Sequence, residues 1–331
     1  MWTSRSAFLL ALCCGVVMVA RSPDAGPELT SPERKALEYL AREVPSWSKE
    51  NRCFSCHNNG DAARALYEAT SRPVPLRSVV TDEALADTTR WLSKPENWDH
   101  NGGEGPFSDK VLARVQFSSA LAAAVKVGAV RDRSVVSMAA ERLARDQSAE
   151  GFWPVEGNVH AVGSPASYGR ALATLSARDA LRAISPKAHA GNIAKAERWL
   201  LARPIDNVFD ASVALLAASG TDNPETVSIR NRAMKILRAG QSREGGWGPF
   251  VTAPPEPFDT ALAVLALSKL DPDDEIRERI KRARNDLIAT QLADGSWPET
   301  TRPPGAESYA QRLSTTGWAT LALLASTPPN E

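Results

Sequence analysis

The segment Gln241-Ser242-Arg243-Glu244-Gly245-Gly246-Trp247 decides the fold of this chain, because its pattern recurs. The same spacing, Q-x-x-x-G-x-W, begins at Gln147 and at Gln291 and ends at Trp153 and Trp297. The last two copies begin 50 residues apart, and the first two begin 94 apart, which is two such periods with one degenerate copy between. A fixed period of this size indicates stacked supersecondary units.

Each unit is predicted to contain two helices of opposite character. The helix before the motif is amphipathic and charged, so one face packs and the other meets water. These outer helices are expected at Pro32–Val44, Asp82–Leu92, Ser134–Arg145, Ala188–Leu201, Pro224–Ala239 and Glu275–Thr290. The helix after the motif is apolar nearly all round, which predicts a buried helix. These inner helices are expected at Asp61–Ala69, Val111–Val127, Ser167–Leu181, Asp210–Ala218, Asp259–Leu270 and Thr315–Ala325.

Six charged helices alternating with six apolar ones predict an all-α (α/α)6 toroid, in which an outer ring wraps an inner ring. We expect residues 26–331 to form this single domain. Within each motif the glycine is expected to cap the end of the outer helix in a left-handed conformation. The glutamine is expected to hold loose backbone groups, and the tryptophan to pack against the next unit.

The repeats resemble the QW motif of squalene-hopene cyclases and related terpenoid cyclases, and the same toroid occurs in protein prenyltransferase β-subunits. The resemblance covers roughly residues 80–326. With the cysteine motif described below, the chain resembles exported bacterial proteins that combine such repeats with a c-type haem motif. The cyclase resemblance implies a toroid cavity for an isoprenoid or other apolar substrate.

A cyclase needs a strong acid, which the family builds from an Asp-x-Asp-Asp-Thr-Ala motif at the start of an inner helix. The best match here is Phe258-Asp259-Thr260-Ala261, in which Phe258 replaces the adjacent Asp. A lone carboxylate lacks the coupled partner that helps to hold its proton, which argues against cyclase activity. Asp259 and its sister Asp210 are weak catalytic candidates, with helix capping as the alternative, and Asp271–Asp274 is expected to cap an outer helix.

Two other toroid enzyme classes find little support in the residues. A prenyltransferase needs zinc held by an Asp, a Cys and a His, and no cysteine follows Cys56. A glycan hydrolase or lyase needs paired carboxylates or a Tyr–His pair. Glu104, Glu156, His160 and Tyr168 are available, but their spacing selects no such pair.

The N-terminus predicts an export signal. Arg5 supplies a positive charge, and the apolar run Ala7–Ala20 is too short for a comfortable membrane span. We expect residues 1–25 to be a signal peptide and the protein to be periplasmic or otherwise extracytoplasmic. A retained anchor, which would add membrane association, and a lipid on Cys13 or Cys14 are the alternatives. The net charge of zero argues against a nucleic-acid partner, which would need a basic face.

The stretch Cys53-Phe54-Ser55-Cys56-His57 has the pattern of a c-type haem attachment site. The two thiols would form thioethers to the haem vinyl groups, and His57 would be the proximal iron ligand. Once the signal is removed, no other cysteine remains. We therefore expect covalent haem c as cofactor. A Cys53–Cys56 disulfide, with His57 as a helix-start residue, is the alternative.

The toroid places all connections from outer to inner helices on one rim, together with the haem motif. His100 and His160 lie on such connections and are candidate distal iron ligands, and an open sixth position is the alternative. Met138 and Met234 fall inside outer helices, and His189 is expected on the opposite rim. Tyr309 is expected on the last connection, beside the first if the ring closes.

The sequence thus predicts an exported c-type haem-binding toroid with a redox role or haem-based ligand binding. Its partner would be a redox protein or a small apolar ligand. Two alternatives stay open at this point. One is an enzyme that acts on an isoprenoid or other apolar substrate in the toroid cavity, and the other is a haem-free interaction scaffold.

Overall fold

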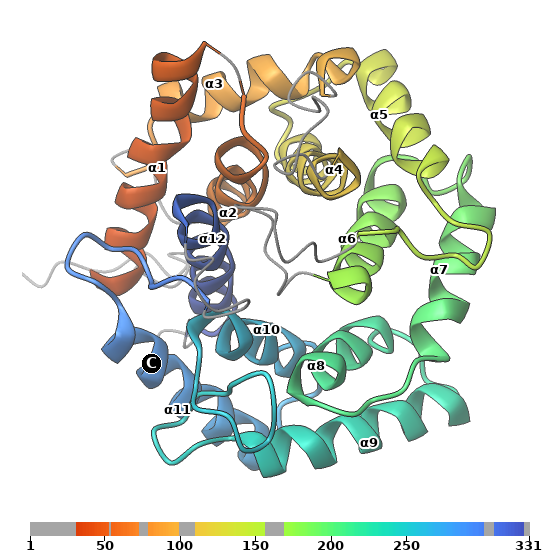
Figure 1. The fold of residues 1–331 in the computed structure, drawn as a ribbon, viewed down its shortest axis with the longest axis vertical. Coiled ribbons are helices and arrows are strands. Elements are labelled where there is room, and N and C mark those ends of the chain that lie inside the picture. The colour runs from red at the N-terminus through yellow and green to blue at the C-terminus, as the bar shows by residue number, and fades with distance from the viewer. Residues whose placement is uncertain are drawn as a thin grey trace, which may run out of the picture.

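The computed structural model describes residues 31–52, 54–72, 79–98, 110–155, 169–300 and 308–327. Its twelve α-helices form two concentric rings, with the inner helices seen nearly end-on in Figure 1. Helices of the two rings alternate along the chain, and the last inner helix lies beside the first. The predicted (α/α)6 toroid is therefore confirmed.

The outer ring consists of α1 (Ser31–Asn51), α3 (Asp82–Leu92), α5 (Arg133–Arg145), α7 (Ala190–Leu201), α9 (Pro224–Gly240) and α11 (Asp274–Thr290). The inner ring consists of α2 (Ala63–Thr70), α4 (Lys110–Lys126), α6 (Gly169–Ile184), α8 (Val208–Ala217), α10 (Pro257–Leu267) and α12 (Tyr309–Ala325). A π-helical turn, η1 (His57–Ala62), leads directly into α2, and a short 3-10 turn, η2 (Pro95–Asn97), follows α3. The segment Asn58–Gly60, expected as a loop, is thus helical.

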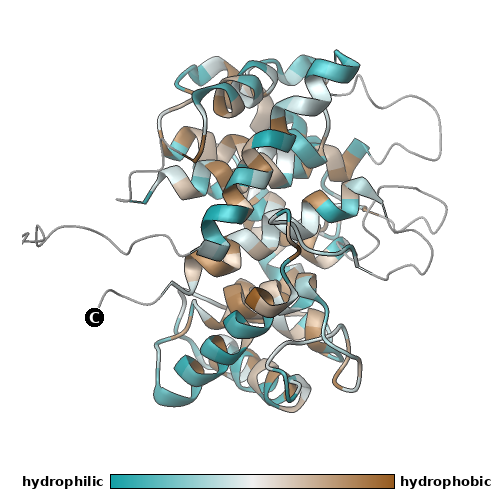
Figure 2. Cartoon of the chain, turned by 90° about the vertical axis from the view of Figure 1, so that its left-hand side faces the viewer, coloured by the Kyte–Doolittle hydropathy of each residue, from teal (hydrophilic) through white to brown (hydrophobic). Residues whose placement is uncertain are grey.

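Apolar periodicity explains which helix joins which ring. The inner helix α10 buries every residue from Phe258 to Leu267 except Leu265. The outer helix α9 buries a stripe at spacings of three and four, including Ile229, Ala233 and Leu237. Hydrophilic residues accordingly lie along the outward faces of the outer helices in Figure 2.

The motif tryptophans are fully buried between neighbouring units. Trp247 donates from its indole Nε1 to the Leu237 carbonyl of α9 at 2.8 Å, and its backbone N–H donates to Thr260 Oγ1 of α10 at 2.9 Å. Each tryptophan therefore ties an outer helix to the inner helix that follows it. The same two bonds are made by Trp153 with Leu143 and Thr174, and by Trp297 with Leu287 and Thr316.

The motif glutamine and glycine join one unit to the next. Gln241 Nε2 donates to the Gly245 carbonyl at 2.8 Å and to the Arg279 carbonyl of α11 at 3.0 Å. Gly245 has a φ of 112°, and a Cβ there would lie 2.4 Å from the Arg282 carbonyl oxygen. The expected helix-capping role is wrong, because α9 ends five residues earlier, at Gly240. Glycine is needed there because of its positive φ and the close approach of α11.

The third motif closes the ring onto the first helix. Gln291 Nε2 donates to the Pro32 carbonyl of α1 at 2.9 Å, and Gly295 packs against the Lys35 carbonyl. A buried ion pair, Arg284 to Glu33 at 2.9 Å, joins α11 to α1 beside this contact. The last repeat is thus joined to the first by the same glutamine and glycine contacts as in the other motifs, and by one additional ion pair.

Three local expectations can be compared with the structure. Asp273 caps α11 by accepting from the Ile276 N–H at 2.7 Å, which confirms capping for that acidic segment. Helix α12 begins at Tyr309, six residues before the expected start, with Ser308 as its cap. Helix α1 continues through Pro45 to Asn51 rather than ending at Val44. None of the helices within the described ranges is long and apolar enough to cross a membrane.

Candidate functional site

A cavity of about 930 Å³ lies inside the inner ring, toward the C-terminal ends of the inner helices. Residues from all six inner helices or from their ends line it. Small alanine side chains account for much of this wall. The apolar lining comprises Ala122, Ala123, Val125, Leu175, Ala180, Ala183, Leu216, Leu265, Trp318, Leu321, Leu324 and Ala325. The volume falls within the roughly 300–1,000 Å³ of small-molecule sites.

Six charged side chains also line the cavity, namely Arg64, Glu68, Arg72, Lys126, Asp179 and Lys269. The two acidic ones are already paired. Lys126 Nζ lies 2.9 Å from Glu68 Oε2, and Asp179 is paired at 2.7 Å with the buried Arg178. The remaining cations form no ion pair with the residues that the structure describes, although the charges of Glu33 and Glu68 act on Arg72. The wall of the cavity therefore carries an excess of positive charge.

Arg64 and Trp318 form one side of this cavity. The Arg64 guanidinium carbon lies 4.8 Å from the centre of the Trp318 ring, within the range of a cation–π contact. Arg64 is on α2 and Trp318 is on α12, so the contact spans the junction between the first and the last repeats. It leaves the guanidinium half-buried at an apolar wall.

A buried carboxyl lies one helical turn away from that contact. Asp61 Oδ2 accepts from Gln116 Nε2 of α4 at 2.9 Å and from the Ser314 hydroxyl of α12. Its Oδ1 is buried and has no hydrogen-bond partner among the residues that the structure describes. Burial raises the pKa of Asp61, while the bonds from Ser314 and Gln116 and the charge of Arg64 act in the opposite direction. The net shift favours the neutral acid.

The register of the helices relates this acid to the cavity. The inner helices run in the same direction, so residues three or four later lie about 5 Å along on the same face. Arg64 follows Asp61 by three, and Trp318 follows Ser314 by four. The layer that contains Asp61 therefore precedes the cavity wall by one turn.

Glycine and a π-helical turn bring these three helices together. A Cβ on Gly60 would lie 2.8 Å from Gln116 Cβ, and a Cβ on Gly317 would lie 2.8 Å from the Asp61 carbonyl oxygen. The wider turn η1 contributes Asp61 itself, and such turns often occur at functional sites. At these positions glycine thus permits close contact between neighbouring helices, although it is a poor helix former.

Cys56 and His57 lie at the other end of the inner ring, just before α2. Cys56 Sγ is 3.4 Å from His57 Nε2, and within the described ranges the buried His57 Nδ1 has no hydrogen-bond partner. Burial lowers the pKa of His57 from 6.5 to about 4, so the ring is neutral at neutral pH. In a c-type haem two cysteine thiols form thioethers with the vinyl groups, and a neutral imidazole ligates the iron. Cys53, His100 and His160 lie outside the described residues.

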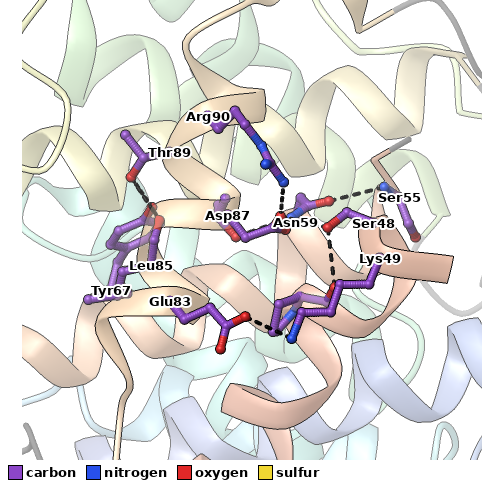
Figure 3. Close-up of polar contacts among 12 residues, drawn as sticks. Ser48, Lys49, Ser55, Asn59, Tyr67, Glu83, Leu85, Asp87, Thr89 and Arg90 are labelled. Carbon is purple, nitrogen blue, oxygen red and sulfur yellow. Dashed lines mark hydrogen bonds and ion pairs between the residues drawn. The ribbon is translucent and has the colours of Figure 1, made fainter. Parts of the chain in front are cut away.

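A polar network holds the turn that carries Cys56 and His57 (Figure 3). Asn59 Oδ1 accepts from the Ser55 N–H at 3.1 Å, and Asn59 Nδ2 donates to Asp87 Oδ2 of α3 at 3.3 Å. The Ser48 hydroxyl of α1 donates to the other oxygen of Asp87 at 2.6 Å. Buried side chains therefore fix the turn against two outer helices. All four of these residues lie in the interior.

Tyr309 lies beside the first inner-helix start, as predicted from ring closure. Asn58 Nδ2 donates to the Tyr309 hydroxyl at 2.9 Å, and that hydroxyl donates to Glu43 Oε2 at 3.0 Å. Burial and the charge of Glu43 raise the pKa of Tyr309 to about 12. Tyr309 is the first residue of α12 rather than a loop residue.

The two predicted catalytic acids lie apart from the cavity wall. Asp259 is buried in the first turn of α10, and Asp210 pairs with Arg203 at 3.1 Å. Neither is an N-cap, because Asn207 caps α8 and Glu256 holds that position in α10. Neither belongs to the lining of the cavity.

Sequence reasoning missed four residues, Asp61, Arg64, Arg72 and Trp318. The signal available was a pair of opposite charges, Asp61 and Arg64, inside an alanine-rich inner segment. Such charges ordinarily face water. Their burial depends on α4 and α12, whose contacting residues are 55 and 253 positions away in the chain.

Comparison with known proteins supports the architecture. Residues 198–331 match the family model described as squalene-hopene cyclase C-terminal domain. A segment of 92 residues is 35% identical to drimenyl diphosphate synthase from Streptomyces showdoensis. That segment spans 27% of this chain and 17% of the relative, so most of the relative has no counterpart in the match.

Solved structures share the fold over most of the chain. The apo type II terpene cyclase MstE from Scytonema superposes with a TM-score of 0.56 at 13% identity, covering 89% of this chain and 98% of that one. A possible member of the GH105 family from Klebsiella pneumoniae gives 0.52 at 10% identity, covering 98% of both chains. The chain therefore has an α/α-toroid fold like that of the type II terpene cyclases, and its residues 198–331 are similar to a squalene-hopene cyclase C-terminal domain.

Proposed function

We propose that this protein binds and acts on an isoprenoid or another elongated apolar substrate in its central cavity. The carrying observation is the apolar wall that all six inner helices share around about 930 Å³. A binding site of that kind buries most of a ligand's surface and gains affinity from the apolar area removed from water.

The relatives support the same substrate class. One MstE structure holds geranylgeranyl dihydroxybenzoate as substrate, at 14% identity and a TM-score of 0.55. The matched synthase from Streptomyces showdoensis is named for an isoprenoid diphosphate. These names describe those proteins, and they favour an isoprenoid over a glycan for this cavity.

Turnover by protonation of an alkene would need a carboxylic acid that stays protonated. Asp61 meets this condition because burial raises its pKa, and it lies one helical turn from the cavity wall, whereas Asp259 and Asp210 do not line the cavity. We therefore infer that Asp61 is the candidate acid. Asp61→Asn is expected to abolish turnover of an isoprenoid while its binding persists.

Binding can be tested by thermal unfolding with geranylgeraniol or squalene dispersed in mild detergent. A ligand at about 100 times its Kd adds about 2.7 kcal/mol of stability, which is a shift of several degrees in Tm. Ala122→Trp, which projects an indole into the cavity, is expected to remove the shift. Ala239→Trp on the exposed side of α9 is the matched control and should keep it. No shift with any isoprenoid, or equal shifts in both variants, would contradict the proposal.

A second function is favoured by the proximity of Cys56 and His57. We propose that Cys53 and Cys56 hold a covalent haem and that His57 ligates its iron, in an exported protein with a redox partner. Bound haem would supply electron transfer or ligand binding at iron. The proposal is supported by the pattern Cys53-Phe54-Ser55-Cys56-His57, whose Cys56 and His57 lie directly at the start of η1.

This second function has its own experiment. Protein expressed with a cytochrome c maturation system should show a Soret band and retain its haem after denaturation. Cys53→Ala with Cys56→Ala should lose the covalent stain, whereas His57→Ala should keep the stain with an altered spectrum. Colourless wild-type protein would overturn the haem proposal and leave the cavity proposal intact.

A further inference from the structure

Three tryptophans in the first two repeats bury an indole N–H that has no hydrogen-bond partner among the described residues. They are Trp47, Trp91 and Trp98. The three motif tryptophans differ, because each donates from Nε1 to the carbonyl of the residue ten positions earlier, at 2.8 Å. A buried donor without an acceptor costs free energy. These indoles therefore indicate an acceptor that the described residues do not supply.

Two of these indoles belong to an aromatic cluster that begins inside the haem motif. The Phe54 ring centre lies 5.4 Å from that of Trp91 on α3 and 5.1 Å from that of Phe117 on α4. The Phe117 ring in turn lies 5.6 Å from the ring of Trp98, which directly follows η2. Because Phe54 is two residues before Cys56, the cluster lies beside the position at which a haem would be attached.

The buried carboxylate of Asp87, on α3, is not the missing acceptor. It accepts hydrogen bonds from Ser48 at 2.6 Å, from Asn59 at 3.3 Å and from Arg90. Three donors thus occupy this carboxylate, and neither indole nitrogen is among them. Trp98 is only 3% exposed, so its N–H does not face bulk water either. Its acceptor has to come from a group beyond the described residues.

A haem attached to the motif would bring both the acceptors and the flat surface that this cluster fits. A porphyrin carries two propionate carboxylates at its edge, and hydrogen bonds to a carboxylate are shorter and stronger than bonds between neutral groups. Its face is a planar apolar π-system, which packs well against aromatic rings. Indole offers an N–H donor and an apolar ring in one side chain. The cluster therefore matches a porphyrin in both respects.

Resting on the haem function proposed above, we propose that Trp91 and Trp98 position the haem by donating from their indole N–H groups to its propionates. Phe54 and Phe117 form the apolar wall between the two donors. The iron ligand is still His57, and the indoles act on the iron only through the charge of the propionates. They are therefore positioning residues.

The experiment measures the midpoint potential of the haem over a range of pH, in holo-protein made with a cytochrome c maturation system. Trp91→Phe and Trp98→Phe keep an aromatic ring and remove the N–H. Without the donor, the propionate charge is less compensated and stabilises the oxidised iron. The potential is therefore expected to fall in each variant, by about a threefold change in the ratio of reduced to oxidised haem.

The pH dependence of the potential is a readout that a purely structural role would not move. A hydrogen bond to the charged form of a carboxyl group lowers its pKa. Loss of the indole donor should thus move the propionate ionisation, seen as a change of slope in the potential against pH, toward higher pH. A residue that only fills space would alter stability and leave this slope unchanged.

Trp199→Phe is the matched control, because Trp199 has the same kind of surroundings as Trp91. Its ring centre lies 5.3 Å from that of Phe152, and an arginine lies over each of the two tryptophan rings. Trp199 belongs to α7, on the opposite side of the toroid from α1 (Figure 1), so its variant should keep the wild-type potential. Circular dichroism checks folding, and Trp91→Phe, at a half-buried ring, tests the proposal if Trp98→Phe unfolds.

The outcomes separate this inference from the haem function on which it rests. If wild-type protein stays colourless after expression with the maturation system, both fail together. If haem is attached and both Trp91→Phe and Trp98→Phe match wild type at every pH, the role of the indoles is wrong and the haem function stands. An equal fall of the potential in Trp199→Phe would also overturn the inference, because the effect would then come from a general loss of packing.

Discussion

The motif-bearing repeats and the first repeat make the same kind of turn by different chemistry. In the former, Trp247 fills the turn, and its N–H donates to the Thr260 hydroxyl of the next inner helix. In the first repeat, Phe54 is the buried aromatic and Ser55 N–H donates to Asn59 Oδ1. A buried polar network and a π-helical turn accompany it. Buried polar groups are costly unless they are satisfied. The polar network therefore indicates that the first repeat has a functional role in addition to a structural one.

The largest expected effect tests the apolar side of this comparison. Trp247→Ala removes a fully buried indole and its hydrogen bond to the Leu237 carbonyl, so the free energy of unfolding should fall by about 3–5 kcal/mol. Urea unfolding measures the loss. Phe250→Ala, at a ring that is 57% exposed, is the control and should change stability by less than about 0.5 kcal/mol. Similar losses at the two positions would mean that the motif does not hold the ring together.

The second prediction concerns the junction between the two kinds of repeat. Glu33→Ala leaves Arg284 buried without its carboxylate partner, which should cost about 3 kcal/mol. The Arg238–Glu275 pair is exposed, so Glu275→Ala should cost less than about 1 kcal/mol. Equal costs in urea unfolding would show that burial of the closing pair is unimportant.

The contrast also explains how far the sequence could predict the molecule. Periodicity placed eleven of the twelve helices within about two residues at their starts, apart from α12, because apolar stripes and caps are local signals. The start of α12 was predicted six residues too late, because the polar residues Tyr309 and Gln311 do not continue the apolar pattern of an inner helix. The expected end of α1 lies just before Pro45. The helix instead continues past it, and its Ser48 donates a hydrogen bond to Asp87 of α3.

The candidate site was less predictable than the fold. Cys56 and His57 were visible as a motif, and their proximity is seen in the structure. Asp61 and Arg64 were not recognised, because their roles depend on helices brought beside them only when the ring closes. The sequence alone predicts neither whether a charged residue on an apolar helix is buried nor which residue it contacts.

A smaller loss is expected from the polar network of the first repeat. Asn59→Ala removes the bond to Asp87 Oδ2 and the acceptor of the Ser55 N–H, which should cost about 1–3 kcal/mol. Asn231→Ala, at an exposed position of α9, controls for the loss of an amide and should be nearly neutral. If Asn59→Ala is equally neutral, the network is not a structural support, and the comparison with the tryptophan turns loses its basis.

The smallest effect, a change of pH slope, tests whether the buried acid of the first repeat is neutral. Gln116 and Ser314 donate to Asp61, Arg64 is the charged group that faces it, and Trp318 lies beside it. Burial nevertheless raises the pKa of Asp61. As pH rises above the unfolded value of 3.8, the unfolded chain loses this proton while the folded chain keeps it. Its contribution to stability therefore falls with rising pH until the folded pKa is passed.

Asp61→Asn removes that titration but keeps a neutral side chain of the same shape. Its stability relative to wild type should therefore rise from pH 4 toward neutral pH in urea unfolding. Asp132 gives the opposite sign, because bonds from Ser134 lower its pKa. Asp132→Asn should thus lose stability relative to wild type as pH rises through the lowered folded pKa of Asp132 toward the unfolded value of 3.8, and should change little from pH 4 toward neutral pH. Parallel slopes for the two variants would mean that Asp61 is ionised in the folded protein, which removes its candidacy as an acid and adds a negative charge beside Arg64.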